Sequence, residues 1–201
     1  MVPRLSRERQ RQVNREAVLD AAVRVFRERG YQGTTLEAIA ETAGFSRGVT
    51  YSQFSSKADL FLAALERRRA ERAAGQHTAA AAGDDPWRSF IDEIVEQQMA
   101  DPAWILATME FRATAMRDPE VARRYRALHA VSLRDLAADL AAIYGRTGLA
   151  PPAPPDALAR VLAAMGAGAV MEETAGAAVD GTTARQAVRA VLGLTQGEGH
   201  P

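Results

Sequence analysis

The spacing of apolar side chains constrains the fold of this chain more than any other feature of its sequence. Between Arg9 and Arg29, apolar residues recur every three or four positions and would form one stripe along a helix. Most later segments show similar spacing, whereas the β-branched alternation that marks strands and hairpins is missing. We therefore predict an all-α protein of about nine helices.

Cap residues, glycines and prolines divide the chain into these helices. Each of three Asp-Pro steps, at Asp85, Asp101 and Asp118, places an N-cap carboxylate before a proline, and a proline's missing N–H costs nothing in the first turn. Four prolines between residues 148 and 155 indicate a linker or surface loop. The predicted helices span about residues 9–29, 35–43, 46–54, 57–74, 86–100, 102–117, 119–144, 156–179 and 183–194.

Charge is distributed unevenly along the chain, although the net charge is zero. Residues 1–75 carry 14 basic and 9 acidic side chains, a net charge of +5 that leaves −5 for the remainder. A basic end on an otherwise acidic chain suggests that only this end meets a polyanion such as nucleic acid. Lys57 is the only lysine, so almost all of the positive charge is carried by arginine.

The stretch from Gly30 to Phe61 carries the most functional information. Two short helices joined by Ala43-Gly44-Phe45 have the form of a helix-turn-helix. Such a motif projects its second helix, here with Ser46 as its cap, so that the first residues of that helix can enter a major groove. A plain helical hairpin would share this outline. DNA binding is favoured because the outward face holds no acidic residue and offers Arg47, Val49, Tyr51, Ser52 and Gln53.

The first of the two short helices has two possible caps, Thr34 and Thr35. Thr34 and Glu37 have the spacing of a capping box, in which each side chain bonds the backbone N–H of the other residue.

About fifty residues carry a more specific pattern, which comprises Val18-Leu19-Asp20-Ala21-Ala22, Phe26, Gly30-Tyr31, Thr34-Thr35-Leu36, Ile39-Ala40, Ala43-Gly44-Phe45-Ser46, Gly48, Tyr51, Phe54, Ser56-Lys57 and Leu60-Phe61. In this register the chain resembles the tetracycline-repressor-like (TetR) family of transcriptional regulators. The rest of the chain matches that family only in the number and length of its helices. The resemblance implies residues 1–56 as a DNA-binding domain with a basic arm and residues 57–195 as a helical ligand-binding and dimerisation domain. Residues 196–201 are expected to form a disordered tail.

The resemblance also implies roles for individual residues at the DNA. Tyr51 and Lys57 are expected at phosphates, and Arg47 is expected over base edges. Arg47 could read guanine through two hydrogen bonds, and a simple phosphate contact is the alternative. The full set that we expect at the DNA is Thr35, Ser46, Arg47, Gly48, Val49, Tyr51, Ser52, Gln53 and Lys57.

Two positions depart from the family pattern. Thr50 stands where a larger aliphatic residue is usual, and we expect its hydroxyl to bond back to the helix backbone. Gln53 stands where an aromatic residue or histidine is common, so base preference is expected to differ.

The triplet Arg67-Arg68-Arg69 is interpreted as a solvated helix face. The basic N-terminal arm has two possible roles. It could follow phosphates or enter the minor groove of DNA, or it could be a solvated tail. Its arginines are Arg4, Arg7, Arg9 and Arg11.

A regulator of this type is expected to be a homodimer, because two recognition helices must meet two half-sites of a palindromic operator in double-stranded DNA. We expect the last two helices to form the dimer interface, with an internal helix pair as the alternative. Their small or apolar faces comprise Ala163, Ala164, Gly166, Ala167, Gly168, Ala169, Val188, Val191 and Leu192.

The middle helices concentrate aromatic, methionine and a few ionisable side chains, which can line an adaptable apolar pocket. Each is individually more typical of ordinary core or surface. We predict that a small hydrophobic ligand binds near Trp87, Phe90, Met99, Trp104, Met109, Glu110, Phe111, Tyr125, His129 and Met171. The family's usual behaviour implies that this ligand releases the repressor from its operator, and activation or action without a ligand is the alternative.

Other classes of protein are disfavoured. The chain has no cysteine, and its three histidines lie far apart, so we predict neither a metal site nor a cofactor. No phosphate-binding loop or nucleophile elbow is present, and we predict no enzymatic activity. The longest uncharged apolar run, Val161–Met171, is about half a membrane span, so we expect no membrane association. The absence of cysteine suits a reducing compartment, and we expect a cytoplasmic protein. The competing hypothesis is a helical ligand carrier that has lost DNA binding.

Overall fold

The computed structural model describes residues 7–83 and 85–194. Within them the chain forms nine α-helices and no strand, which confirms the predicted all-α fold class. No helix in this part of the chain is both long and apolar enough to cross a membrane. The helices are α1 (Arg7–Arg29), α2 (Leu36–Thr42), α3 (Arg47–Tyr51), α4 (Lys57–Ala81), α5 (Pro86–Met99), α6 (Pro102–Ala115), α7 (Pro119–Thr147), α8 (Pro155–Thr174) and α9 (Gly181–Val191).

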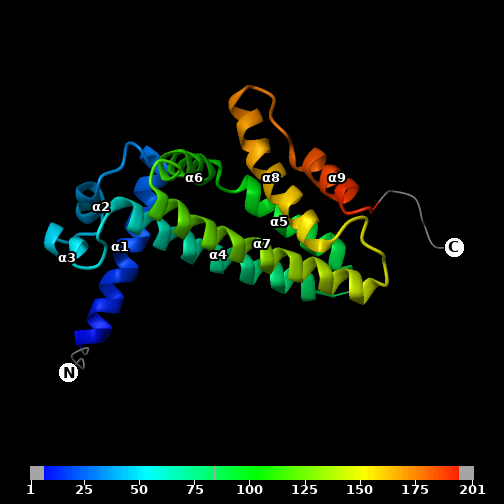
Figure 1. Ribbon diagram of the computed structural model, residues 1–201, viewed down its shortest axis with the longest axis horizontal. Helices are drawn as coiled ribbons and strands as arrows, with labels where there is room; N and C mark the ends of the chain where they lie inside the picture. The colour runs from blue at the N-terminus through cyan, green and yellow to red at the C-terminus, as the bar shows by residue number, and fades with distance from the viewer. Residues whose placement is uncertain (1–6, 84, 195–201) are drawn as a thin grey trace. The chain divides into compact units, whose positions relative to one another are not determined.

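The helices gather into two compact units. The N-terminal unit comprises Met1–Arg68 and Ala103–Arg126, and the C-terminal unit comprises Arg69–Pro102 and Ala127–Pro201. In the N-terminal unit, α2 lies against α1 and α3 lies against α2 (Figure 1). In the C-terminal unit, α5 packs against both α8 and α9. The N-terminal unit thus includes most of α6, which lies far from α1–α3 in the sequence.

Aromatic rings form the centre of the N-terminal unit. Phe61 of α4 packs edge-on against Phe26 of α1 at a ring-centroid distance of 4.7 Å, and it stacks on Phe111 of α6 at 4.6 Å. Trp104 stacks on the same ring at 5.2 Å, and Tyr31 meets it edge-on at 5.1 Å. Aromatic side chains bury the largest apolar areas, and their edge-to-face pairs add about 0.5–1.5 kcal/mol each. This aromatic cluster therefore joins α1, α4 and α6 into one unit.

The C-terminal unit has a separate core between α5, α7, α8 and α9. Trp87 packs edge-on against Tyr144 with ring centroids 4.6 Å apart, and Phe90 is fully buried beside them. The Tyr144 hydroxyl donates to the carbonyl of Leu192 at 2.7 Å, just after the end of α9. Because a buried hydroxyl without a partner is costly, this hydrogen bond fixes the end of α9 against α7.

Two predicted helix ends differ from the structure by five residues or more, those of α4 and α8. The helix predicted to end near Ala74 continues to Ala81, and Gly75 lies inside it. A side chain at Gly75 would collide with the carboxylate of Glu93, so the glycine allows α5 to approach closely instead of ending α4. The helix predicted to reach residue 179 ends at Thr174, because Gly176 turns into the left-handed region at φ +82°.

Candidate nucleic-acid interface

The turn between α1 and α2 is held by threonine side chains. Gly30 ends α1 with φ +69°, and the Thr34 hydroxyl donates to the Gly30 carbonyl at 2.6 Å from a fully buried position. Thr35 is the N-cap of α2, and its hydroxyl accepts from the Ala38 N–H at 3.2 Å. The predicted capping box between Thr34 and Glu37 is therefore wrong, because Thr34 points back toward α1.

The turn between α2 and α3 has the geometry of a helix-turn-helix. Gly44 adopts φ +71°, and no atom lies within 4 Å of the position that a Cβ would take. Glycine is therefore favoured here by the left-handed backbone conformation and not by a lack of space. The Phe45 N–H donates to the Ala40 carbonyl at 3.0 Å, and the Phe45 ring packs against the core of the N-terminal unit. These contacts fix the start of α3 at Ser46, which has N-cap dihedrals but makes no side-chain cap hydrogen bond.

The outward face of α3 is open to solvent. The Arg47 side chain is 73% exposed and Tyr51 is 48% exposed, while Gly48 and Ser52 are also exposed and Val49 is half-buried. The α3 helix has five residues and ends at Tyr51, three residues before the predicted end. The exposed residues include a guanidinium, a phenol and a hydroxyl, which can bond bases and phosphates.

Thr50 lies on the opposite face of α3 and is fully buried. Its hydroxyl has no hydrogen-bond partner among the described residues, so the expected bond back to the helix backbone is wrong. The methyl group fills the aliphatic position, and the unpaired hydroxyl carries a cost of about 1–3 kcal/mol.

Glu37 of α2 lies beside the recognition face, which the sequence had indicated to be free of acidic residues. The Tyr51 hydroxyl donates to Glu37 Oε1 at 3.0 Å, and Arg47 Nη1 lies 3.8 Å from the same oxygen. Hydrogen bonds, first from its own backbone N–H and then from Tyr51, lower the pKa of Glu37, and the Arg47 charge adds to this. The same contact raises the pKa of Tyr51. Glu37 thus contacts two of the side chains that we expect at DNA, Tyr51 and Arg47.

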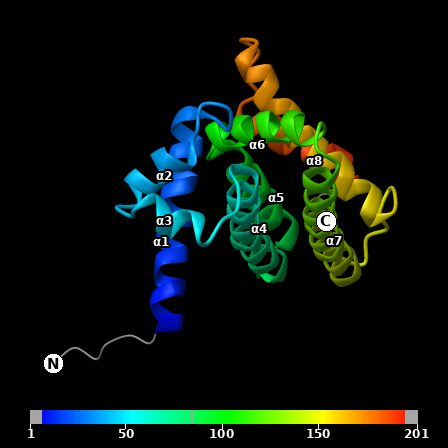
Figure 2. The same cartoon turned by 60° about the vertical axis from the view of Figure 1, so that its left-hand side comes forward.

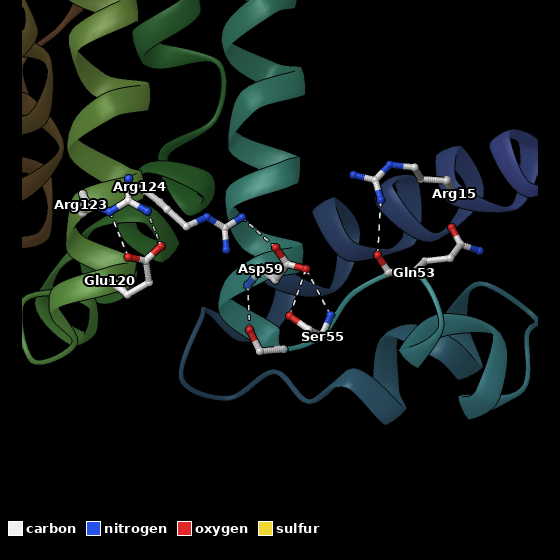
Figure 3. A network of polar contacts seen from close by, with 8 residues as sticks. Arg15, Gln53, Ser55, Asp59, Glu120, Arg123 and Arg124 are labelled. Carbon is white, nitrogen blue, oxygen red and sulfur yellow. Dashed lines mark hydrogen bonds and ion pairs between the residues drawn. The ribbon is translucent and has the colours of Figure 1, made fainter.

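The end of the recognition segment is attached to α1. Arg15 Nη1 lies 3.5 Å from the carbonyl oxygen of Gln53, and the Arg15 guanidinium lies 4.4 Å from the centre of the Phe54 ring (Figure 3). The Gln53 Oε1 atom is buried without a hydrogen-bond partner among the described residues. Arg15 therefore binds the backbone of Gln53 and does not satisfy its side-chain oxygen.

A polar network sets the start of α4. The Ser56 hydroxyl accepts from the Asp59 N–H at 3.0 Å, and Asp59 Oδ2 accepts from the Ser55 N–H at 3.1 Å. Arg124 of α7 donates to the other Asp59 oxygen at 2.8 Å (Figure 3). Partial burial alone would raise the pKa of Asp59, but the hydrogen bonds from Arg124 and the Ser55 backbone outweigh it and lower the pKa.

Lys57, the second residue expected at phosphate, turns toward the protein. Its Nζ donates to the carbonyl of Tyr31 at 2.7 Å and to that of Gln32 at 3.3 Å, and it lies 4.4 Å from the centre of the Tyr31 ring. Partial burial lowers the pKa of Lys57, and the charge of Glu110 opposes that change. The expected phosphate contact remains a prediction.

Further arginines lie along α1 and α4. Arg7, Arg9 and Arg11 are exposed on the first turns of α1, which extend past α2 and α3 (Figure 2), whereas Arg4 lies outside the described residues. The interpretation of residues 67–69 as a solvated face is wrong, because all three are half-buried. Their partners are Asp20 at 2.7 Å for Arg67, the Trp104 ring at 4.8 Å for Arg68, and Asp135 at 2.6 Å for Arg69.

The ten residues predicted to line a ligand pocket are divided between the two units. Those in the N-terminal unit are Trp104, Met109, Glu110, Phe111 and Tyr125, and those in the C-terminal unit are Trp87, Phe90, Met99, His129 and Met171. Trp104, Phe111 and Tyr125 belong to the aromatic cluster of the N-terminal unit. Met99 and Met171 are exposed. No metal-binding group of His and acidic side chains occurs in the described part of the chain.

The faces of α8 and α9 that we expected in a dimer interface are partly used within the C-terminal unit. Val188 and Leu192 are buried in its core, and a side chain at Gly166 would collide with Gln98 of α5. Val161 and Met171 of α8 are 45% and 58% exposed. The dimer interface therefore remains a prediction, and its exposed apolar part lies on α8.

Two sequence models of protein families match this chain. The model described as "Bacterial regulatory proteins, tetR family" matches residues 18–64, which hold the helix-turn-helix. The model described as "BetI-type transcriptional repressor, C-terminal" matches residues 84–195. The chain belongs to the TetR family. The resemblance seen in the sequence is thereby confirmed, and the members of this family are transcriptional regulators.

Individual proteins of similar sequence or fold agree with this assignment. The HTH-type transcriptional repressor AcnR of Corynebacterium diphtheriae is 33% identical over 116 residues, which are 56% of this chain and 56% of that protein. The chain thus spans little more than half the length of this relative.

Two solved structures share the fold. FadR from Bacillus subtilis, in complex with stearoyl-CoA, has a TM-score of 0.72 and 14% identity and covers 90% of this chain and 99% of its own. A transcriptional regulator from Saccharomonospora viridis, in complex with choline, has a TM-score of 0.68 and 21% identity and covers 88% and 93%.

Proposed function

We propose that this chain is a sequence-specific DNA-binding repressor. The observation that supports it most directly is the exposed face of α3 within a helix-turn-helix whose family is known. Arg47 and Tyr51 are exposed there, and both contact Glu37. Arg47 is the residue proposed to read a base, and Tyr51 is proposed to bind phosphate. Thr35, as the cap of α2, and Ser46, with an unused hydroxyl at the start of α3, are placed to support backbone contacts.

We further propose that the repressor acts as a homodimer in the cytoplasm. Two copies are needed because one α3 helix covers one half-site, and a palindromic operator presents two half-sites about one helical turn apart. The exposed apolar residues of α8, Val161 and Met171, would lie in the dimer interface.

A small ligand is proposed to release the repressor. The two structural neighbours described above bind stearoyl-CoA and choline, so proteins of this fold accept ligands of very different chemistry. Binding must then be negatively coupled, so that ligand and operator each lower the affinity for the other by the same factor. A compound that raises the melting temperature of the protein is expected to weaken operator binding. A stabilising compound that leaves operator affinity unchanged would contradict this coupling.

The DNA-binding proposal is tested by selection from a pool of random-sequence duplexes. We expect enrichment of a palindrome, followed by salt-sensitive binding in fluorescence anisotropy. Arg47→Ala should lower the affinity for the enriched duplex more than that for random duplex, whereas Arg146→Ala, an exposed arginine at the end of α7, should change neither. No enrichment with a folded, ligand-free protein would refute the repressor and favour a ligand carrier.

A further inference from the structure

Positive charge gathers at a second place in the chain, outside its first 75 residues. Residues 112–126 carry five arginines and two acidic side chains, a net charge of +3, whereas the rest of residues 76–201 has a net charge of −8. The structure assigns this segment to the N-terminal unit. The residues of that unit comprise 17 basic and 11 acidic side chains, a net charge of +6 that leaves −6 for the C-terminal unit. The excess positive charge therefore belongs to the unit that holds the helix-turn-helix.

Residues 112–126 form the corner between α6 and α7, and the helices on both sides of this α6–α7 corner pack within the N-terminal unit. On the α6 side, Glu110 accepts a hydrogen bond from the Gln32 N–H of the α1–α2 loop at 2.9 Å. On the α7 side, Val121 and Tyr125 pack against the core of the unit. Asp118 caps α7 by accepting from the backbone N–H groups of residues 120 and 121 at 3.0 and 3.1 Å. The corner is therefore a defined part of this unit.

The α6–α7 corner lies at the same end of the unit as the loop between α3 and α4. Arg124 donates to Asp59 of α4 at 2.8 Å, and the second oxygen of Asp59 accepts from the Ser55 N–H at 3.1 Å. Both helices run in the same direction from this end (Figure 3), so the residues before Arg124 extend past Asp59 toward the α3–α4 loop. Lys57, which we expect at a phosphate, lies two residues before Asp59. The corner therefore adjoins the expected phosphate contact.

Three of the five arginines in the corner have no acidic partner in the part of the chain that the structure describes. Of the other two, Arg124 pairs with Asp59, and Arg123 donates to Glu120 at 2.9 and 2.6 Å (Figure 3). The three arginines without such a partner are all exposed, and they are Arg112, Arg117 and Arg126. An exposed guanidinium presents several N–H donors to solvent in a geometry that suits the oxygens of a phosphate.

A solvated surface is the alternative explanation for these arginines. Such a surface usually mixes both signs of charge. Here, the two carboxylates of the corner are already engaged, Asp118 as the cap of α7 and Glu120 with Arg123. Arg123 and Arg126 also lie three residues apart on α7, where like charges destabilise a helix. A polyanion at the corner would offset this repulsion, whereas solvent alone would not.

We propose that the α6–α7 corner is a second DNA-contacting surface, which binds backbone phosphates next to the phosphate expected at the start of α4. Arg117 is assigned to such a phosphate, because it is exposed in the turn that leads into α7. The proposal rests on the DNA-binding function proposed above and extends the contact beyond the helix-turn-helix. Phosphates are the same in every sequence, so the corner adds affinity and salt dependence but no base specificity.

The first test measures affinity at several salt concentrations, both for the duplex enriched by the wild-type protein and for random-sequence duplex. Arg117→Gln should reduce the slope of log K against log salt by about 0.9 on both duplexes, because one phosphate contact is lost. Arg117→Lys should keep the wild-type slope, and Arg146→Gln, at the far end of α7, should not change it. An unchanged slope in Arg117→Gln, or a loss on the enriched duplex alone, would overturn the proposal.

The second test predicts a gain in affinity. Glu120→Gln removes a negative charge from the corner and releases Arg123, so both duplexes should bind about two- to fivefold more tightly. Damage to the fold would weaken binding instead. Glu172→Gln, the same change at an exposed glutamate of α8, should have no effect. Unchanged or weaker binding by Glu120→Gln would contradict the proposal.

The third test locates the DNA directly. Because the chain has no cysteine, a single introduced cysteine can carry a photo-crosslinking group. With saturating duplex, labelled Arg117→Cys should form a cross-link to DNA and labelled Arg146→Cys should not. Enrichment of a palindrome without a cross-link from residue 117 would refute the corner and leave the proposed function intact. Salt-sensitive binding with this cross-link but without enrichment would support the corner and refute sequence-specific recognition.

Discussion

Replacement of Gly30 by alanine would test the contact between α6 and the α1–α2 loop through protein stability alone. Gly30 and Gly44 lie in the same unit and have nearly the same left-handed dihedral, φ +69° and +71°. They differ in their surroundings. A Cβ at Gly30 would lie 2.7 Å from both Glu110 carboxylate oxygens, whereas nothing lies within 4 Å of a Cβ at Gly44. Gly44→Ala is therefore a matched control for the backbone strain.

The expected difference follows from what each variant loses. An alanine in the left-handed region costs about 1–2 kcal/mol, and the strain is the same at both positions. The entropy that alanine removes from the unfolded chain is also the same, so it cancels in the comparison. At Gly30, in addition, the carboxylate must move and release the Gln32 N–H. A hydrogen bond to a charged group contributes about 1.5–3 kcal/mol, and partial replacement by water reduces this loss to about 1 kcal/mol.

The assay is urea unfolding at constant pH, with both variants in the wild-type and in a Glu110→Ala background. Gly30→Ala should lower the free energy of unfolding by about 1 kcal/mol more than Gly44→Ala in the wild-type background. In Glu110→Ala the excess should vanish, because no carboxylate remains to be displaced. An excess that persists without Glu110, or equal costs in the wild-type background, would refute the contact as described.

Three further results are expected. Phe61→Ala should lower the free energy of unfolding by about 3–5 kcal/mol, because a fully buried ring is removed from the aromatic cluster, and urea unfolding measures it. In Tyr51→Phe the pKa of Glu37 should rise toward its ordinary value, and NMR titration measures it. Because the pKa of Glu37 is lowered in the folded wild-type protein, the ionised carboxylate stabilises the fold at pH values above its ordinary pKa. This stabilisation is lost as the pH falls through the lowered pKa of the folded state. Lys57→Gln should reduce the slope of log K against log salt by about 0.9, because the expected phosphate contact is lost, whereas Arg146→Gln at the end of α7 should leave the slope unchanged.

The helix-turn-helix could be predicted from the sequence because its signals are local. Gly30 and Gly44 mark backbone positions that need positive φ, and Thr35 caps the helix that begins at the next residue. Each of these features involves residues within four positions of one another. Local hydrogen bonding and steric restrictions therefore sufficed to predict α2, the turn and the start of α3.

Features that depend on a distant partner could not be predicted. Glycine is typical of helix ends, but α4 continues past Gly75 to Ala81. The glycine is instead needed for packing, because the Glu93 side chain on α5 occupies the space where its Cβ would lie. The sequence predicts a solvated Arg69, because its partner, Asp135, lies 66 positions away. The sequence predicts only a capping role for Glu37, because its contact with Tyr51 depends on how α2 packs against α3.

The role of α6 shows why a domain boundary in sequence does not define a structural unit. The family models divide the chain between residues 64 and 84, in the region of α4. The aromatic cluster crosses that division, because Phe61 stacks on Trp104 and Phe111 from the other side of it. A fragment that ended before α5 would expose Phe61 and Tyr31 and lose the carboxylate that holds Gln32. The unit that holds the helix-turn-helix therefore includes a helix from the segment that matches the C-terminal family model.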